Sequence, residues 1–301
     1  MLPGIANVQG SANAQRQKQP GESQAALAYR MAKSWFDQLI NATYDVSPGT
    51  TTAMFGGWAA DNKGCCSGSK LGIFDWRMLS AAGSWSVPAY YNCAKNIRLI
   101  AERMARERRA VEASGGGGAT TTILPTITPM GATAFSGGRL RSSELFDVTI
   151  QLFANGATGL SVFTEQAIDD PGILLAWGEA ISIAAGVEDI LVNGTVGWDC
   201  ATVHSGNAVG SSMSLEGRHF VAITPDIVSQ WGHASAPPPA TVSFSLKADS
   251  PSAYELRDLR SPSKPAVRCP AGRCDKQTLT LDSSVGTGGM SAAFLFAPAA
   301  S

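Results

Sequence analysis

Three carboxylates in this sequence could carry acid–base or nucleophilic chemistry: Glu165, Asp75 and Asp61. Glu165 directly follows the strand-like run Leu160–Thr164, Asp61 lies shortly after a Gly-Gly pair, and Asp75 stands between two aromatic residues. A carboxylate at the end of a strand can donate a proton, accept one or attack an electrophilic carbon. The alternative for Glu165 is a carboxylate without a catalytic role, at a helix start or in a loop, that nearby amides stabilise.

The cysteine spacing indicates one disulfide. Cys269 and Cys274 enclose four residues that include Pro270 and Gly272, and this short interval favours a bond across a tight turn. Half of a zinc site is the weaker alternative, because no second Cys or His pair stands at ligand spacing. Six cysteines permit three bridges. The adjacent residues Cys65 and Cys66 are expected to bridge to separate partners, for which Cys93 and Cys200 are the candidates.

Other motifs exclude several chemistries. The three histidines are His204, His219 and His233. Their spacing matches neither a metal-ligand motif nor a catalytic triad, so the sequence predicts no metal site and no Ser/His/Asp site. The run Gly115–Gly118 precedes a predicted strand, whereas a phosphate loop follows one, so it is interpreted as a connector. The stretch Arg98–Arg109 alternates with glutamates at helical spacing, which is typical of a solvated helix face. We expect no cofactor.

Composition limits the partners further. The chain has 301 residues, 44% of them hydrophobic, and a formal net charge of -1. Without a basic surface, nucleic acid is not an expected partner. The longest apolar run, Ile173–Val187, is too short and too interrupted to span a bilayer. The oligomeric state is not specified by the sequence.

Two glycosylation sequons, at Asn41 and Asn193, accompany the cysteines and favour an extracellular or secretory location. The first residues, Met1–Gln19, lack the charged start and apolar core of a signal peptide. Either the protein is intracellular or its true start is missing, and we expect the latter. Residues 1–20 are predicted to be disordered.

Hydrophobic periodicity predicts alternating helices and strands in the first two thirds of the chain. The predicted helices are Glu22–Tyr44, Asn92–Ala113, Ser142–Ala154 and Pro171–Ala185. The predicted strands are Thr51–Phe55, Thr120–Thr128 and Ala157–Phe163, with one more short strand within Ile73–Tyr91. This alternation is typical of parallel strands with helices between them.

After Asp189 helical periodicity ends and short strands bounded by Gly, Pro, Ser or Asp follow one another. They are expected at Ser211–Leu215, His219–Thr224, Thr241–Leu246, Ala253–Leu259, Gln277–Leu281 and Met290–Phe296. The pattern predicts an antiparallel β-sandwich over residues 196–301, which follows an α/β domain over residues 21–195 in the chain.

One segment carries a family resemblance. Asn155–Thr164 followed by Glu165, then a helix that starts with proline, then Glu188–Gly194, resembles the closing βα units of a glycoside-hydrolase-type (β/α)8 barrel. The segment beyond resembles the β-sandwich that often follows such barrels. The architectural resemblance covers roughly Thr51–Pro298 and has no motif that selects one numbered family. A full barrel needs eight βα units, and only three or four are visible, so we expect a partial (β/α)-barrel that lacks its front half.

The resemblance implies hydrolysis of glycosidic bonds by paired carboxylates, Glu165 with Asp75 or Asp61, and a polysaccharide or oligosaccharide as partner. Aromatic side chains on which sugar rings could stack are Trp58, Trp76, Trp85, Tyr90 and Tyr91. The alternative for these aromatics is a core cluster. Two other functions stay open: a non-catalytic extracellular glycoprotein that binds polysaccharide or belongs to a wall or matrix, and an inactive barrel fragment.

Overall fold

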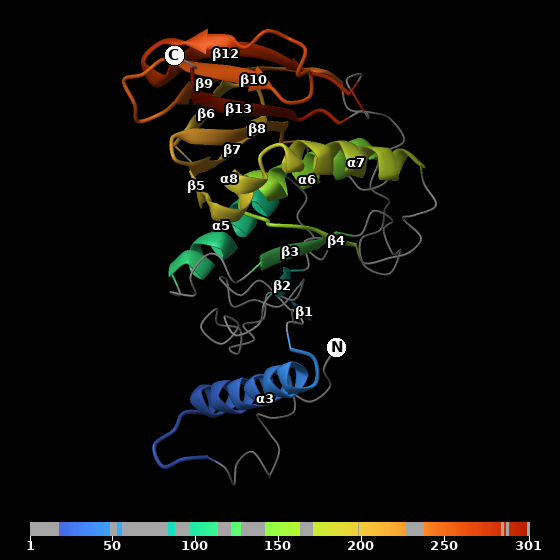
Figure 1. The fold of residues 1–301 in the computed structure, drawn as a ribbon, viewed down its shortest axis with the longest axis vertical. Coiled ribbons are helices and arrows are strands. Elements are labelled where there is room, and N and C mark those ends of the chain that lie inside the picture. The colour runs from blue at the N-terminus through green and yellow to red at the C-terminus, as the bar shows by residue number, and fades with distance from the viewer. Residues whose placement is uncertain are drawn as a thin grey trace.

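The computed structural model describes residues 18–48, 53–55, 84–87, 97–113, 122–127, 142–162, 171–197, 199–226, 238–283, 286 and 289–299. Figure 1 shows the antiparallel strands of the C-terminal part at one end of the molecule, with helices α5 to α8 beside them. A small parallel sheet lies next to this helical layer, and α3 lies at the opposite end.

The helices follow the hydrophobic pattern closely. α6 and α7 begin and end at the predicted residues, and the short α8 was not foreseen. α5 is described from Ile97, and the preceding residues 92–96 of the predicted helix lie outside the described residues. Ser23 caps the N-terminus of α3, because its Oγ accepts a hydrogen bond of 3.1 Å from the backbone N–H of Ala26. The bounds are α3 Gln24–Val46, α5 Ile97–Ala113, α6 Ser142–Ala154, α7 Pro171–Ala185 and α8 Glu188–Asn193.

Four parallel strands form one sheet in the order β1-β2-β3-β4, which is also their order in the chain. They are β1 Ala53–Phe55, β2 Ser84–Val87, β3 Thr122–Ile127 and β4 Ser161–Val162. The predicted parallel pairing is therefore confirmed for the strands that are described. These strands form an open sheet and not a closed barrel, so the expected half-barrel stays an interpretation of this sheet.

The later strands pair antiparallel, as predicted, in a six-stranded sheet and a three-stranded sheet. A two-residue turn at Glu216 and Gly217, both with positive φ, joins β7 to β8 and matches the twist of a hairpin. The six-stranded sheet has the order β11-β10-β13-β8-β7-β5, with bounds Val267–Cys269, Tyr254–Asp258, Ala292–Pro298, Arg218–Pro225, Ala208–Leu215 and Thr195–Val196. The three-stranded sheet is β12 Arg273–Leu281, β9 Ala240–Lys247 and β6 Ala201–Ser205.

Two hydrophobic clusters use the two faces of the six-stranded sheet. One lies between the two antiparallel sheets and includes Phe244, Tyr254 and Phe296. The other joins the helices to the opposite face, where Met213 and Phe220 belong to the same cluster as residues of α5, α6 and α7. The helices thus share a core with strands that follow Val196. The division into domains at residues 21–195 and 196–301 remains a prediction.

The helix α6 also carries a buried row of polar side chains toward the six-stranded sheet. Asp147 and Gln151 of α6 and Asn155, the residue that follows its last turn, stand four residues apart, which places them on one side of the helix. Asp147 Oδ1 accepts hydrogen bonds of 2.7 Å from both the N–H and the hydroxyl of Ser291. Gln151 donates to the Thr224 hydroxyl at 2.8 Å, and this hydroxyl lies 2.7 Å from that of Ser291. Because these buried polar groups find their hydrogen-bond partners in one another and in the sheet, the row fixes the position of α6 on the sheet.

Arg260, in the connection after β10, holds the helices and the strands together. Its side chain is 5% exposed, and its Nε donates to Glu179 of α7 at 2.8 Å. Its Nη1 donates to the carbonyl oxygens of Gly289 and Ser291 at 2.6 and 2.9 Å. The guanidinium carbon lies 4.3 Å from the centre of the Phe146 ring on α6. One side chain therefore contacts both packed helices and the segment leading into β13.

The interpretation of Arg98–Arg109 as a solvated face is wrong for two of its residues, because Glu107 and Arg108 are buried. Arg108 donates to the carbonyl oxygens of Val192 and Gly194 at 3.0 and 2.9 Å. These carbonyls lie at the C-terminus of α8, where backbone acceptors lack partners inside the helix. Arg108 thus joins α5 to the end of α8.

Candidate functional site

The carboxyl ends of parallel strands lie at one edge of their sheet, and the loops that leave this edge commonly carry chemistry. Along the chain, Glu165 is three residues beyond β4 and Asp61 is six residues beyond β1, whereas Asp75 is nine residues before β2. All three carboxylates lie outside the described residues. Their catalytic roles stay predictions, with Glu165 and Asp61 following the carboxyl end of a described strand.

Strand order limits how these carboxylates could meet. Among the strands that the structure describes, β1 and β4 are the two outer ones of this sheet, and three strand spacings of about 4.8 Å correspond to about 14 Å in a flat sheet. The inner strands supply no nearby acid, because the first carboxylate after β2 is Glu102 within α5 and the first after β3 is Glu144 within α6. Paired carboxylates at this edge therefore require the sheet to curl or to be extended by further strands.

The segment before β4 is positioned by β3. The Thr158 hydroxyl accepts a hydrogen bond of 2.9 Å from the Ile123 N–H, and the Thr158 N–H donates to the Ile123 carbonyl at 3.1 Å. Gly159 lies so close to Leu124 that a Cβ at this position would come within 2.7 Å of its side chain. These contacts set the register in which Ser161 and Val162 pair with β3, and so determine where the chain leaves the sheet toward Glu165.

Of the five aromatic candidates for sugar stacking, only Trp85 lies in a described element. It is the second residue of β2, where its backbone is paired with Met54 of β1 and Ile123 of β3. The other four lie outside the described residues: Trp58, Trp76, Tyr90 and Tyr91. Sugar binding by this set remains a prediction.

The described carboxyl group with a raised pKa is Asp147, which the sequence had not singled out. Burial raises its pKa from the ordinary 3.8 to about 6, against the opposing effect of its hydrogen bonds to Ser291 and of the nearby Arg260 charge. Perturbed carboxyl groups often mark active sites. Asp147 instead lies between α6 and the six-stranded sheet, bonded to core groups, so we assign it a structural role.

The described histidines give no catalytic constellation. His204 Nε2 lies 2.8 Å from the Ser245 hydroxyl, and His219 Nδ1 lies 2.6 Å from the Ser214 hydroxyl. Burial lowers the pKa of His219, and its Nε2 is buried without a hydrogen-bond partner. Within the described part of the chain, no group of three His, Cys, Asp or Glu side chains could hold a metal ion.

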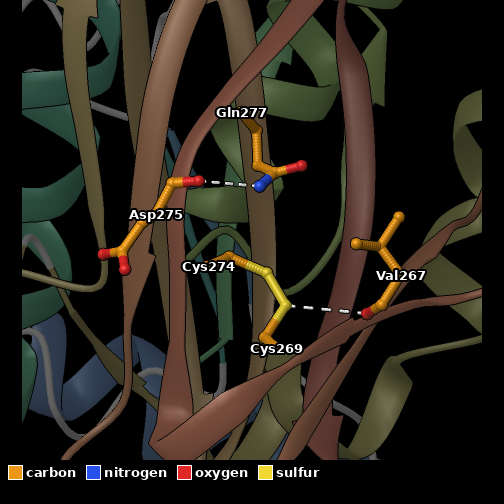
Figure 2. Close-up of a disulfide and its surroundings, with 5 residues drawn as sticks. All are labelled: Val267, Cys269, Cys274, Asp275 and Gln277. Carbon is orange, nitrogen blue, oxygen red and sulfur yellow. Dashed lines mark hydrogen bonds between the residues drawn. A yellow bond between two sulfur atoms is a disulfide. The ribbon is translucent and has the colours of Figure 1, made fainter.

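The predicted disulfide between Cys269 and Cys274 is confirmed. Figure 2 shows it beside Val267, whose carbonyl oxygen lies 3.6 Å from the Cys269 sulfur. The two α-carbons are 4.8 Å apart, across a turn in which Ala271 and Gly272 both have positive φ.

Cys200 is a free thiol, and burial raises its pKa to about 12. Its predicted role as a bridging partner is thus not realised in this structure. The other three cysteines lie outside the described residues: Cys65, Cys66 and Cys93.

Both sequons lie on the surface. Asn41 is an exposed residue within α3, and Asn193 is the exposed last residue of α8, followed by the buried Gly194 and the exposed Thr195. Among the helices that the structure describes, none has both the length and the apolar character needed to cross a membrane.

Comparison with known proteins shows which solved structures have a similar fold, but it identifies no family for this chain. No family model matches the chain, and no curated protein matches it either. Among solved structures, an Anoxybacillus alpha-amylase, described as a new glycosyl hydrolase subclass, aligns over 89% of this chain with a TM-score of 0.52 and 12% identity. The gamma-CGTase of alkalophilic Bacillus clarkii aligns over 87% with a TM-score of 0.48 and 12% identity, and a GH30 endoxylanase of Clostridium papyrosolvens over 88% with 0.42 and 10%.

The shares of the matched chains are smaller: 57% of the amylase, 38% of the CGTase and 61% of the endoxylanase. This chain therefore spans a little over half the length of the amylase it matches. At this identity the likeness concerns the fold alone. The chain has a fold similar to that of a glycoside hydrolase, built from helices, a parallel sheet and antiparallel sheets.

Proposed function

We propose that this protein is a carbohydrate-active protein of the glycoside-hydrolase type, which cleaves glycosidic bonds with Glu165 and a second carboxylate from Asp61 or Asp75. The observation that carries the proposal is the fold shared with the Anoxybacillus alpha-amylase over 89% of this chain. The position of Glu165 just beyond β4 supports it, because β4 is held to β3 in a parallel sheet. A carboxylate there could protonate the leaving oxygen or attack the anomeric carbon.

The test replaces Glu165 by glutamine. The amide is nearly isosteric but can neither ionise nor exchange a proton at neutral pH, so a catalytic Glu165 predicts at least about a 100-fold loss of hydrolysis with an unchanged melting temperature. Turnover is measured on a panel of polysaccharides and aryl glycosides. Glu188→Gln is the matched control, because Glu188 is an exposed glutamate in the first turn of α8. Reduced stability with unchanged activity per folded molecule would assign Glu165 a structural role.

A second candidate function is polysaccharide binding without cleavage. It is favoured by the absence of a carboxylate between β2 and α5 and between β3 and α6, so that the candidate acids follow only the outer strands. Isothermal titration with soluble polysaccharides separates the two functions. Binding that persists in Glu165→Gln, with no turnover by the natural sequence, would support the binder.

We also propose an extracellular location with glycans on Asn41 and Asn193. The exposure of both asparagines and the Cys269–Cys274 disulfide support this proposal. Secretion from a eukaryotic host, followed by peptide N-glycosidase and mass measurement, tests each sequon. Recovery of the unmodified mass at a sequon would remove that site.

A further inference from the structure

His219 belongs to a row of three rings on the side of the six-stranded sheet that faces the three-stranded sheet. The row crosses the neighbouring strands β8, β13 and β10. The ring centre of Phe296 lies 5.8 Å from that of His219 and 4.7 Å from that of Tyr254. Phe296 and Tyr254 are buried members of the hydrophobic cluster between the two antiparallel sheets. A titratable ring therefore stands beside apolar rings at the end of this core.

The two ring nitrogens of His219 have different surroundings. Nδ1 lies 2.6 Å from the hydroxyl of Ser214 on the adjacent strand β7. Nε2 is closed to solvent and has no hydrogen-bond partner among the described residues. When Nδ1–H of a neutral imidazole donates to Ser214, Nε2 carries only a lone pair and needs no acceptor. An imidazolium has an N–H at both positions, so its Nε2–H would be buried without an acceptor.

The charged groups around the ring do not offset this cost. Burial lowers the pKa of His219, and the carboxylate of Asp249, in the connection before β10, opposes this shift only in part. The Asp249 side chain is 97% exposed, so solvent screens its charge. Arg218 precedes His219 and therefore points to the other face of β8, where it pairs with Asp189 of α8. The closed arrangement thus favours the neutral ring.

The same rings support the end of the hairpin that β7 and β8 form. Ser214 and His219 are paired across this hairpin, close to its turn at Glu216 and Gly217. Gly217 lies against Tyr254, since a Cβ at this glycine would be 3.1 Å from the phenol oxygen. Glu216 is exposed. The end of the hairpin is therefore held on the row by the His219 ring and by the turn.

We propose that His219 is a pH switch, which holds the end of the β7–β8 hairpin on the sandwich core at neutral pH and releases it in mildly acidic solution. A proton from the solvent binds Nε2, and the new N–H finds an acceptor only in water. The ring then leaves the row, the hairpin end opens, and Tyr254 and Phe296 become accessible. The proposal concerns the antiparallel strands, so it does not depend on the proposed hydrolysis.

Hydrogen exchange of the full chain, measured by mass spectrometry on a peptide covering residues 211–220, tests the switch. The opening constant is the observed exchange rate divided by the intrinsic rate at each pH. The closed state keeps its full stability above pH 6.5, the ordinary histidine pKa, and loses it as the pH falls further. The opening constant of the natural sequence should therefore rise up to about 10-fold between pH 7.5 and pH 5.5.

His219→Gln cannot take up the proton, so its opening constant should not rise. His204→Gln is the matched control, because His204 is an exposed histidine whose Nε2 also lies near a hydroxyl, that of Ser245 at 2.8 Å. This control should respond to pH as the natural sequence does. The difference between the natural sequence and His219→Gln cancels the titration of all other groups, including Asp147.

An opening constant that is the same at both pH values overturns the proposal, and so does an equal rise in His219→Gln. An equal rise in peptides from α6 would also overturn it, because the proton would then unfold the protein as a whole and not the hairpin. Should His219→Gln fail to fold by circular dichroism, His219→Phe replaces it. Phenylalanine keeps a ring in the row and takes up no proton, so the same absence of a rise is expected.

Discussion

Replacing Asp147 by asparagine should make this protein more stable at neutral pH, although it removes a carboxylate that accepts two hydrogen bonds. Asp147 is 7% exposed, and its Oδ1 is bonded to the N–H and the hydroxyl of Ser291. An asparagine Oδ1 can accept the same two bonds. What the substitution removes is the cost of ionising a buried carboxyl group.

The magnitude follows from the pKa, which burial raises from 3.8 to about 6. Since each pKa unit corresponds to about 1.4 kcal/mol, the difference is worth about 3 kcal/mol. A raised folded-state pKa stabilises the protein fully below pH 3.8, and this contribution is lost as the pH rises through 6. The natural sequence should therefore lose about 3 kcal/mol of unfolding free energy from this group between pH 4 and pH 7, and Asp147→Asn should lose none of it.

Urea unfolding at a series of pH values gives the difference between the two proteins, in which the titration of all other groups cancels. Asp249→Asn is the control, because the Asp249 side chain is 97% exposed and the substitution changes the net charge equally. Parallel stability curves for the natural sequence and Asp147→Asn would refute the reasoning, since they would mean that the folded state does not disfavour ionisation of this group.

Three further changes test the contacts that join the layers. Arg260→Ala should cost about 3 kcal/mol, because it breaks a largely buried ion pair with Glu179; a shift in the urea midpoint equal to that of a surface variant would contradict this. Gly289→Ala should lower stability by about 2 kcal/mol, because the added Cβ would overlap the Phe146 ring, and an unchanged melting temperature would show that the segment can move away. Cys274→Ser should cost about 2 kcal/mol by opening the small disulfide loop, and the effect should vanish when both proteins are compared under reducing conditions.

Local patterns were sufficient for the elements whose residues interact with near neighbours in the chain. The apolar periodicity and the leading proline gave both ends of α7, and α6 was equally well delimited. The Cys269–Cys274 bond was predictable because a five-residue separation across a turn brings two cysteines together whatever the rest of the chain does. Parallel pairing of the early strands followed from the alternation of helices and strands.

Long-range packing decided the rest. The strands β5, β6 and β11 have two, five and three residues, and they exist because neighbouring strands complete their hydrogen bonds. The burial of Arg108 and the raised pKa of Asp147 depend on α8 and on β13, which lie far along the chain. A helical pattern shows which side of a helix is apolar, but it does not show which other segment covers that side.

The same distinction applies to the candidate site. The sequence by itself placed Glu165 after a strand and Asp61 after another, because such positions depend only on local strand signals. Only the tertiary structure decided that these two strands are the outermost of the four described parallel strands. Strand order is set by pairing between segments separated by many residues, and no local pattern encodes it. Whether two carboxylates converge therefore depends on what closes the sheet, which is a property of the assembled fold.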